Sequence, residues 1–269
     1  MSLSEKRYMR TKAYVKVRKG NFPDANYYTA WKGFDEIGYE VIKFEEDHEG
    51  TIDVTPETPV FAGVGSCRKI IKRVFGWDYV GINPYPNELM PFMHRNVERK
   101  KWADAREAAL EGHMFIKPVI QKQFNGAVLS TLLDTIRTGK VNPDDEVFVC
   151  DPVNFVSEWR IYVHEHEIVG VKPYFQKEVY DYQLTPFYVE VKKMIDAYKP
   201  SAPVAYGLDL GVIIQPDGVK PKDSIGTNAL TALVEINDGI CLGNYGLDPI
   251  HYAEMISSRW LELTTKGKV

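Results

Sequence analysis

Two polar side chains that could bind a metal ion lie close together in the last third of the chain. Residues 231–239 read T-A-L-V-E-I-N-D-G, and residues 233–236 predict a buried strand that ends in polar positions. Glu235 and Asn237 are two positions apart, so both side chains lie on the same face of that strand. A carboxylate and an amide oxygen that project together from a strand end are suitable ligands for magnesium.

A third oxygen ligand is expected from another apolar segment. Residues 206–214 read Y-G-L-D-L-G-V-I-I, which predicts a second strand that carries Asp209. If the two strands are neighbours, Asp209, Glu235 and Asn237 would hold one or two magnesium ions against the phosphates of a nucleotide. The alternative is that Glu235 and Asn237 cap a strand and enter a turn at Asp238 and Gly239.

A lysine and a glycine-bearing loop upstream could supply phosphate contacts. Residues 114–118 predict a strand that carries Lys117 and ends at a proline, and residues 121–126 predict a polar loop that ends in Gly126. Such a lysine neutralises phosphate charge while the loop closes over the phosphates. Taken alone, Lys117 is more typical of a surface lysine at the end of a strand.

An acidic and a basic residue share one face of a further predicted strand. Residues 155–163 alternate strongly, which places Glu158 and Arg160 on the same face. Arg160 could grip a phosphoryl group, or it could be a structural arginine that pairs with Glu158. Residues 164–167, H-E-H-E, predict a hairpin turn, because no third ligand supports a metal site at the two histidines.

The elements that position these residues follow a mixed order along the chain. The order β-α-β-β-α over roughly the first hundred residues predicts a small α/β domain. Residues 63–66, G-V-G-S, could be a phosphate loop or a tight turn from a strand into a basic helix at 67–75. Beyond it, the sequence predicts a linker at 83–86, helices at 99–111, 188–198 and 252–263, a strand at 146–150, a helix-like segment from about 129, and an exposed insert at 215–228.

Composition restricts the class of protein. The net charge of −4 argues against a general nucleic-acid binder. No apolar run reaches membrane-spanning length, and the N-terminus lacks the apolar core of a signal peptide. The cysteines Cys67, Cys150 and Cys241 are far apart and show no metal-ligand spacing. These features predict a cytoplasmic protein with reduced cysteines and no membrane partner.

Taken in order, these motifs resemble the ATP-grasp enzymes, and most closely the RimK-related clade of phages and bacteria. The resemblance rests on F-I-K-P at 115–118, F-V-S-E-W-R at 155–160, Asp209 and V-E-I-N at 234–237. A K-x-F-x-G loop at 122–126 and the segment G-N-Y-G-L-D at 243–248 also fit that clade. The similarity extends roughly from residue 95 to residue 260.

The resemblance implies the fold and its division into domains. It implies an α/β (α+β) class and an ATP-grasp fold, in which a small N-terminal α/β domain precedes two α+β lobes that clamp ATP. The N-terminal domain would span 1–95 and the ATP-grasp domain 96–269. Within the latter, the nucleotide lobe would cover about 112–175 and the magnesium lobe about 176–263.

The resemblance also implies how the nucleotide would be held. Lys117 would contact the α- and β-phosphates, and Lys122 on the closing loop the outer phosphates. Residues 150–153 would form the hinge that binds adenine through backbone groups, with Cys150, Asp151 and Val153 contributing, because Pro152 has no N–H. Many relatives carry a further phosphate lysine upstream, and here only Lys100 and Lys101 are near, so that contact is unassigned.

The remaining implied roles concern chemistry. Glu158 would bind the ribose hydroxyls, Arg160 would stabilise the transferred phosphoryl group, and Asp209, Glu235 and Asn237 would hold magnesium. The implied function is an ATP-dependent carboxylate–amine ligase that acts on a small-molecule or peptide substrate through an acyl phosphate. The alternatives are an ATP-binding protein without turnover, an ATP-dependent enzyme with another acceptor, and a binding module without a nucleotide.

Overall fold

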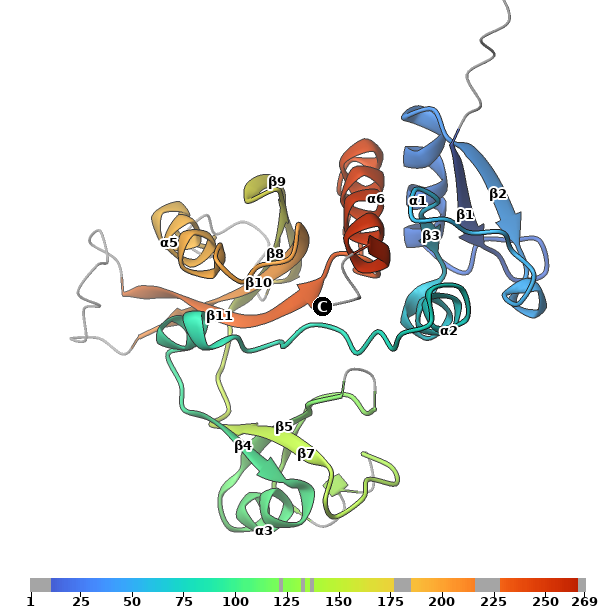
Figure 1. The fold of residues 1–269 in the computed structure, drawn as a ribbon. Coiled ribbons are helices and arrows are strands. Elements are labelled where there is room, and N and C mark those ends of the chain that lie inside the picture. The colour runs from blue at the N-terminus through green and yellow to red at the C-terminus, as the bar shows by residue number, and fades with distance from the viewer. Residues whose placement is uncertain are drawn as a thin grey trace, which may run out of the picture.

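The chain forms three groups of elements that follow one another in space (Figure 1). The computed structural model describes residues 11–120, 123–131, 134–135, 138–176, 185–215 and 228–265 of the 269-residue chain. A small N-terminal domain lies to one side, and two lobes, each built on a four-stranded sheet, lie one above the other. The expected small α/β domain followed by two α+β lobes is therefore confirmed.

The N-terminal domain is built on a three-stranded parallel sheet with the order β2-β1-β3. Its elements follow the predicted order: β1 (Lys12–Lys16), α1 (Ala25–Glu36), β2 (Glu40–Phe44), a 3-10 turn η1 (Glu46–His48), β3 (Val60–Phe61) and α2 (Gly63–Phe75). Helix α2 begins at Gly63 and not at residue 67. Residues 63–66 are therefore its first turn, and Gly63 enters it with a φ of 74° that favours glycine.

A linker then runs along the edge of the lobe that carries β11 (Figure 1). It ends in a 3-10 segment, η2 (Asn87–Phe92). The backbone N–H of Ile236 donates to the carbonyl of Pro84 at 2.9 Å, so the linker pairs with the outer edge of the strand predicted to bind metal. This pairing supplies a partner for a buried backbone group that an edge strand would otherwise leave unsatisfied.

The first lobe contains an antiparallel sheet with the order β4-β7-β5-β6 and one helix. Its elements are β4 (Val97–Lys101), α3 (Trp102–Gly112), β5 (Met114–Pro118), β6 (Ala127–Leu129) and β7 (Glu146–Cys150). The expected helix at 99–111 is wrong over its first turn, because residues 99–101 pair with β7. The helix-like segment expected from about 129 is also wrong at its start, since residues 127–129 pair with β5.

The second lobe contains the antiparallel sheet β11-β10-β8-β9. Its elements are β8 (Ser157–His164), β9 (Glu167–Gln176), α5 (Tyr188–Tyr198), β10 (Ala205–Ile214), β11 (Ala229–Asp238) and α6 (Pro249–Thr265). Glu165 and His166 both have positive φ, which is the two-residue turn of a tight hairpin, so the predicted hairpin is confirmed. The predicted insert at 215–228 lies mostly outside the described residues.

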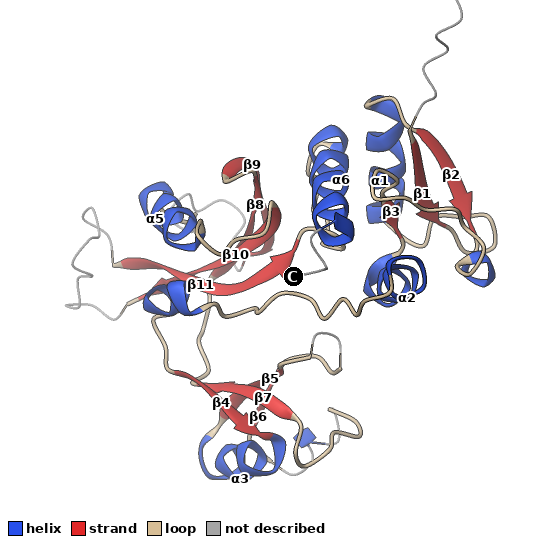
Figure 2. Cartoon of the chain, in the orientation of Figure 1, coloured by secondary structure: helices blue, strands red, loops and turns tan. Residues whose placement is uncertain are grey.

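Strand pairing places the boundary between the lobes earlier than the sequence suggested. Strands β8 and β9 pair with β10 and not with β7, so we infer a boundary at residues 151–156 instead of near residue 175. Each sheet carries its helix, α3 or α5, on the face turned away from the other sheet (Figure 2). The two facing sheets and the linker thus enclose the space in which the predicted site residues gather.

The C-terminal helix α6 joins the second lobe to the N-terminal domain. Figure 1 shows α6 between α1 and the β8–β11 sheet. Trp260 of α6 is fully buried in the core around α2, and Tyr252 is fully buried in the core around α1. Among the described residues, no helix is long and apolar enough to cross a membrane. The cytoplasmic location stays a prediction.

Candidate nucleotide and metal site

The predicted oxygen ligands lie together on neighbouring strands. Asp209 on β10 stands directly opposite Glu235 on β11. The amide nitrogen of Asn237 lies 3.0 Å from an Asp209 oxygen and 3.2 Å from a Glu235 oxygen. Asp209 is 2% exposed. The expectation that β10 and β11 are neighbours is confirmed, and the strand period brings Asn237 to the same face as Glu235.

Arg160 pairs with Asp209 through two parallel hydrogen bonds. Its Nε and one terminal nitrogen donate to the two Asp209 oxygens, both at 2.7 Å. The alternative partner named from the sequence, Glu158, is wrong, because Arg160 stands directly opposite Asp209 on the adjacent strand. Burial alone would lower the pKa of the Arg160 guanidinium, but the hydrogen bonds and charge of Asp209 raise it further. The guanidinium is therefore a permanent positive charge beside Asp209.

Glu158 has a different environment on the same strand. Its carboxylate accepts a 2.8 Å hydrogen bond from the hydroxyl of Tyr174 on β9. Burial raises the pKa of Glu158, and the Asp209 charge adds to that effect while the Tyr174 hydrogen bond opposes it. The Tyr174 ring stacks on Tyr245 with centroids 5.2 Å apart, and the Arg160 guanidinium lies 5.0 Å from the Tyr245 ring. Two tyrosines therefore cover this side of the pair.

Lys117 connects the two lobes electrostatically. Its ammonium forms an ion pair with Glu235 of the other lobe and lies 5.3 Å from the centre of the Tyr85 ring. Gly126, from the glycine-bearing loop, lines the cavities on either side of this pair. Lys122, which the resemblance places on the same loop, lies outside the described residues.

A cavity of about 410 Å³ between the lobes brings most of the predicted nucleotide residues together. Its volume is within the usual range for small-molecule and cofactor sites. The predicted residues that line it are Lys117, Cys150, Asp151, Val153, Glu158 and Glu235. Asp209, Asn237 and Arg160 are not among its lining residues and lie beyond Glu235, to which Asn237 connects them. The cavity therefore has an apolar, hinge-lined end and a charged end.

Arg95 lines the same cavity, although the sequence did not single it out. Its guanidinium donates to the carbonyls of Leu233 and Val234 at 2.7 and 3.1 Å. It also lies about 6 Å from the rings of Tyr85 and Phe155. Arg95 follows the linker and sits in no motif, so the only sequence signal was the unassigned upstream phosphate contact.

The lysines nearest to that unassigned position lie elsewhere. Lys100 pairs with Glu98 at 2.9 Å, and Lys101 pairs with Asp144 at 2.7 Å, both on the outer strand β4. Neither lines the inter-lobe cavity. Arg95 is therefore the basic residue upstream of β5 that faces the predicted nucleotide.

A smaller cavity of about 200 Å³ adjoins the charged end on the side of the N-terminal domain. It shares Lys117, Gly126 and Glu235 with the larger inter-lobe cavity. Its remaining wall includes Asn237 and residues from α2, the linker and the segment after β11, namely Val64, Tyr79, Asp238, Ile240, Cys241 and Leu242. A group bound in this space would lie next to the three predicted metal ligands.

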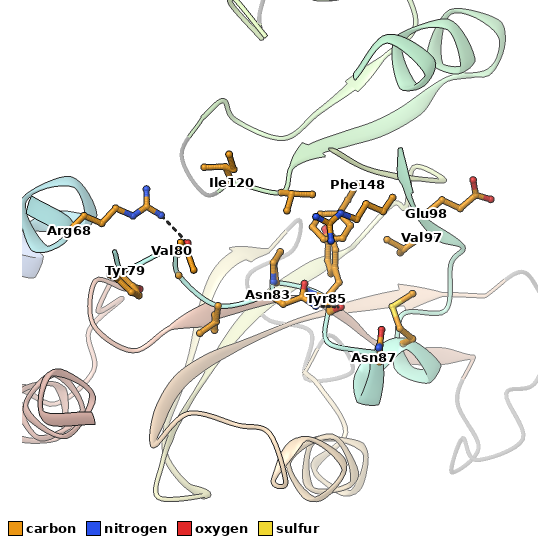
Figure 3. A pocket seen from close by; sticks show the side chains of 16 residues that line it. Arg68, Tyr79, Val80, Asn83, Tyr85, Asn87, Val97, Glu98, Ile120 and Phe148 are labelled. Atoms are coloured by element: carbon orange, nitrogen blue, oxygen red, sulfur yellow. Dashed lines mark hydrogen bonds between the residues drawn. The ribbon is translucent and has the colours of Figure 1, made fainter. Parts of the chain in front are cut away.

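The largest cavity, about 620 Å³, is lined by the linker and the first lobe (Figure 3). Arg68 of α2 donates to the carbonyl of Val80 at its rim, at 3.2 Å. Tyr85 lines both this cavity and the nucleotide cavity, and its ring packs edge-on against Phe148 at 4.8 Å. None of the predicted catalytic, nucleotide or metal residues lines it.

The side chains present fit a magnesium ion. Two carboxylates and one amide oxygen are hard oxygen donors, and magnesium in nucleotide sites is usually held by one or two carboxylates together with phosphates. Lys117 already places a cation against Glu235, which shows that this position attracts positive charge. Among the described residues, no group of three or more His, Cys, Asp or Glu side chains forms an alternative metal cluster.

The fold and the site define the class of protein. A small α/β domain precedes two lobes whose sheets hold a lysine, a hinge and a trio of oxygen ligands around one cavity. Residues 92–255, more than half of the chain, match the family model of an ATP-grasp domain, the second family of its clade. The chain belongs to the ATP-grasp superfamily, and within it to the RimK-related proteins.

Solved structures share this fold at low sequence identity. A RimK-domain ATP-grasp protein from Sphaerobacter thermophilus is 11% identical with a TM-score of 0.56, covering 93% of this chain and 100% of its own. The D-alanine–D-alanine ligase from Bacillus anthracis is 12% identical with a TM-score of 0.50, covering 96% and 99%. The ATP-grasp ligase PsnB, complexed with a variant precursor, magnesium and ADP, is 11% identical with a TM-score of 0.52, covering 96% and 99%. No curated protein sequence matches the chain.

Proposed function

We propose that the protein is an ATP-dependent carboxylate–amine ligase. A substrate carboxylate attacks the γ-phosphate of ATP, which gives an acyl phosphate and ADP, and an amine then displaces phosphate to form an amide. The observation that carries this proposal is the 410 Å³ cavity, which joins the hinge, Lys117 and Glu235 between two lobes and ends at Asp209 and Asn237.

The nucleotide would be held by groups from both lobes. Backbone groups of Cys150, Asp151 and Val153 would contact adenine, and Glu158 the ribose hydroxyls. Lys117 and Arg95 would neutralise the phosphates, which is the main requirement of phosphoryl transfer. Lys122 would add a contact to the outer phosphates. The aromatic rings of Tyr85 and Phe155 beside Arg95 would keep water away from this charge.

The catalytic end would combine fixed charges from three strands. Asp209, Glu235 and Asn237 would hold magnesium, which would neutralise charge on the transferred phosphoryl group. Arg160 spends two donors on Asp209, so it orients that carboxylate, and its other terminal nitrogen makes only a long 3.4 Å contact with the Gly243 carbonyl. We propose that this nitrogen donates to the phosphoryl group as charge redistributes.

The acceptor carboxylate would enter the 200 Å³ cavity next to Lys117 and Glu235. That volume fits one small acid or one residue of a peptide. The structural relatives include a D-alanine–D-alanine ligase and a ligase complexed with a precursor, so both small molecules and peptides are handled on this fold. We propose a small-molecule or peptide substrate.

The test is magnesium-dependent ADP release against panels of amino acids, small carboxylates and peptides, together with calorimetric ATP binding. We expect ATP with magnesium to bind, and at least one acceptor to stimulate ADP release. Glu235→Gln should lose that release because it removes one charge from the metal site, where even an indirect change costs roughly 10- to 100-fold in metal affinity.

The matched control for the metal site is Glu107→Gln, on the exposed face of α3 and outside every cavity described above. Glu107→Gln should behave like the wild-type protein. ADP release by Glu235→Gln at the wild-type rate would refute the metal assignment. ATP binding without acceptor-stimulated ADP release in any panel would favour a binding protein without turnover.

A further inference from the structure

Two cysteines that are far apart in the sequence meet at the wall of the smaller cavity. Cys67 lies on α2, and Cys241 lies in the segment that follows β11. Their sulfur atoms are 3.7 Å apart, although 174 positions separate them along the chain. Both are reduced thiols in this structure. The contact joins the N-terminal domain to the lobe that carries the predicted metal ligands.

The two thiols differ in their access to solvent. Cys67 is 0% exposed, and its sulfur lies 3.7 Å from the carbonyl of Val60. Cys241 is half-buried and lines the 200 Å³ cavity. A small polar oxidant that enters this cavity therefore reaches Cys241 first. Cys67 is then placed to attack the oxidised sulfur, which is the arrangement of a reactive and a resolving cysteine.

The surrounding structure holds both sulfurs in place. Cys67 sits in the second turn of α2, on the face buried against the N-terminal sheet. The segment around Cys241 is fixed on both sides, because Ile240 N–H donates to Asp238 and Tyr252 donates to the Leu242 carbonyl. A disulfide requires the sulfurs to move from 3.7 Å to about 2.05 Å, which small rotations of two cysteine side chains can provide.

We propose that Cys67 and Cys241 form a peroxide-sensitive dithiol, a modification site that closes to an intramolecular disulfide. The Cys241 thiolate attacks one peroxide oxygen, which yields a sulfenic acid and releases the first water after protonation. The Cys67 thiol then attacks that sulfur, the S–O bond breaks, and the second water leaves. Overall, two thiols and one hydrogen peroxide give one disulfide and two waters, so the sulfurs are oxidised and the peroxide is reduced.

The disulfide would fix one wall of the smaller cavity. Val64, which lines that cavity, lies one helical turn before Cys67 on α2. Closing the bond therefore ties the Val64 wall to the segment that leaves the metal-site strand. Cys241 does not line the nucleotide cavity, so ATP binding should persist in the oxidised protein. The expected loss of acceptor-dependent turnover rests on the proposed function, whereas the disulfide itself does not.

The direct test counts thiols in the full-length protein. The reduced protein is exposed to graded hydrogen peroxide, quenched with catalase, unfolded in an alkylating reagent and weighed by mass spectrometry. We expect the three alkylated cysteines of the reduced chain to fall to one, Cys150, with the loss of two hydrogen atoms. Peptide mapping should then recover Cys67 linked to Cys241, and a reductant should reverse the change.

Variants test the assignment of the pair. Cys150→Ser should still form the disulfide, because Cys150 lies on β7 in the other lobe. Cys67→Ser and Cys241→Ser should not, and each melting curve checks that the variant is folded, with Cys67→Ala as a second substitution if serine destabilises the core. The proposal is overturned by three retained thiols at doses that oxidise a small free thiol, by over-oxidation of Cys241 without linkage, or by linkage through Cys150 or between molecules.

A functional measurement separates this proposal from the proposed ligase activity. If the disulfide forms and ATP still binds, acceptor-dependent ADP release should fall and should return on reduction. Loss of ATP binding on disulfide formation would overturn the claim that only the smaller cavity is affected. An absence of ADP release in the reduced protein would contradict the ligase proposal and leave the thiol count as an independent measurement.

Discussion

At the scale of single residues, the pair formed by Arg160 and Asp209 decides how the charged end of the cavity is built. Both side chains are buried, at 6% and 2% exposure, and the pair has two short hydrogen bonds. Breaking a buried ion pair by removing one partner typically costs about 3–5 kcal/mol, because the other charge stays uncompensated. The pair is therefore a structural element as well as a candidate catalytic one.

Arg160→Lys tests which role dominates. Lysine keeps the charge but cannot copy the two-pronged contact, so we expect a lower melting temperature. If the second terminal nitrogen contacts the transferred phosphoryl group, single-turnover ADP formation by the folded protein should fall roughly 100- to 1,000-fold. ATP affinity should change far less, since Lys117 and Arg95 remain.

The chain offers a matched control for this substitution. Arg259 pairs with Asp238 through the same two contacts, at 2.8 and 2.7 Å, and is similarly buried, but it does not line the nucleotide cavity. Arg259→Lys should lower the melting temperature and leave ADP formation per folded molecule unchanged. Equal rates for Arg160→Lys and the wild-type protein would refute a catalytic role for Arg160.

Lys117→Ala tests the nucleotide assignment. It removes a charged contact to the phosphates in the ground state, which is worth about 1.5–3 kcal/mol, or roughly 10- to 150-fold in ATP affinity. Lys100→Ala, which removes a lysine paired on the outer strand β4, is the control and should bind ATP normally. An unchanged calorimetric dissociation constant for Lys117→Ala would make it an ordinary strand-end lysine.

At the scale of elements, a buried polar cluster ties β1, η1 and α2 together. Lys16 donates to Glu49 at 3.0 Å and to Ser66 at 2.9 Å. Burial raises the pKa of the Glu49 carboxyl, but hydrogen bonds from Ser66 and Lys16, with the charges of Lys16 and Lys69, bring it below its usual value of 4.5. The carboxylate is thus favoured in the folded state.

The lowered pKa of Glu49 gives a pH dependence with a defined sign. The unfolded chain binds the proton more tightly, so this contribution is complete above pH 4.5 and is lost as the pH falls through the folded-state pKa. Glu49→Gln should be less stable than the wild-type protein at neutral pH, and the difference should shrink in acid. Urea denaturation across this range measures it. A stability difference that does not change with pH would contradict the assignment.

At the scale of the whole molecule, close packing of α1 against α6 joins the N-terminal domain to the second lobe. A Cβ at Gly33 would lie 1.9 Å from the carbonyl oxygen of Pro249, at the first residue of α6. Backbone cannot yield as a flexible side chain can, so Gly33→Ala should destabilise the protein by about 1–3 kcal/mol. The urea midpoint is the measurement.

Gly65→Ala provides the control for helix propensity. Gly65 also lies in a helix, but a Cβ there meets no atom within 4 Å. This substitution should be neutral or should stabilise α2 by up to about 1 kcal/mol. If both substitutions gave the same change, the α1–α6 contact would not be the cause.

Local periodicity was sufficient to determine the elements that carry the predicted site. Strands β5 and β7 and helix α5 were predicted with the bounds found, because their apolar spacing and flanking turns are local properties. Glu235 and Asn237 share a face for the same reason. Residues 99–101 and 127–129 were predicted incorrectly, because pairing with β7 and β5 overrides their local preference.

Only the tertiary structure decided which residues meet across the sheets and domains. Strand register places Asp209 between Arg160 and Glu235, and no spacing along the chain encodes that register. Arg95 enters the nucleotide cavity because the linker returns along β11, and the sequence around it has no motif. Cys67 and Cys241 appeared unrelated in the sequence, yet packing of the N-terminal domain onto the second lobe brings their sulfurs into contact.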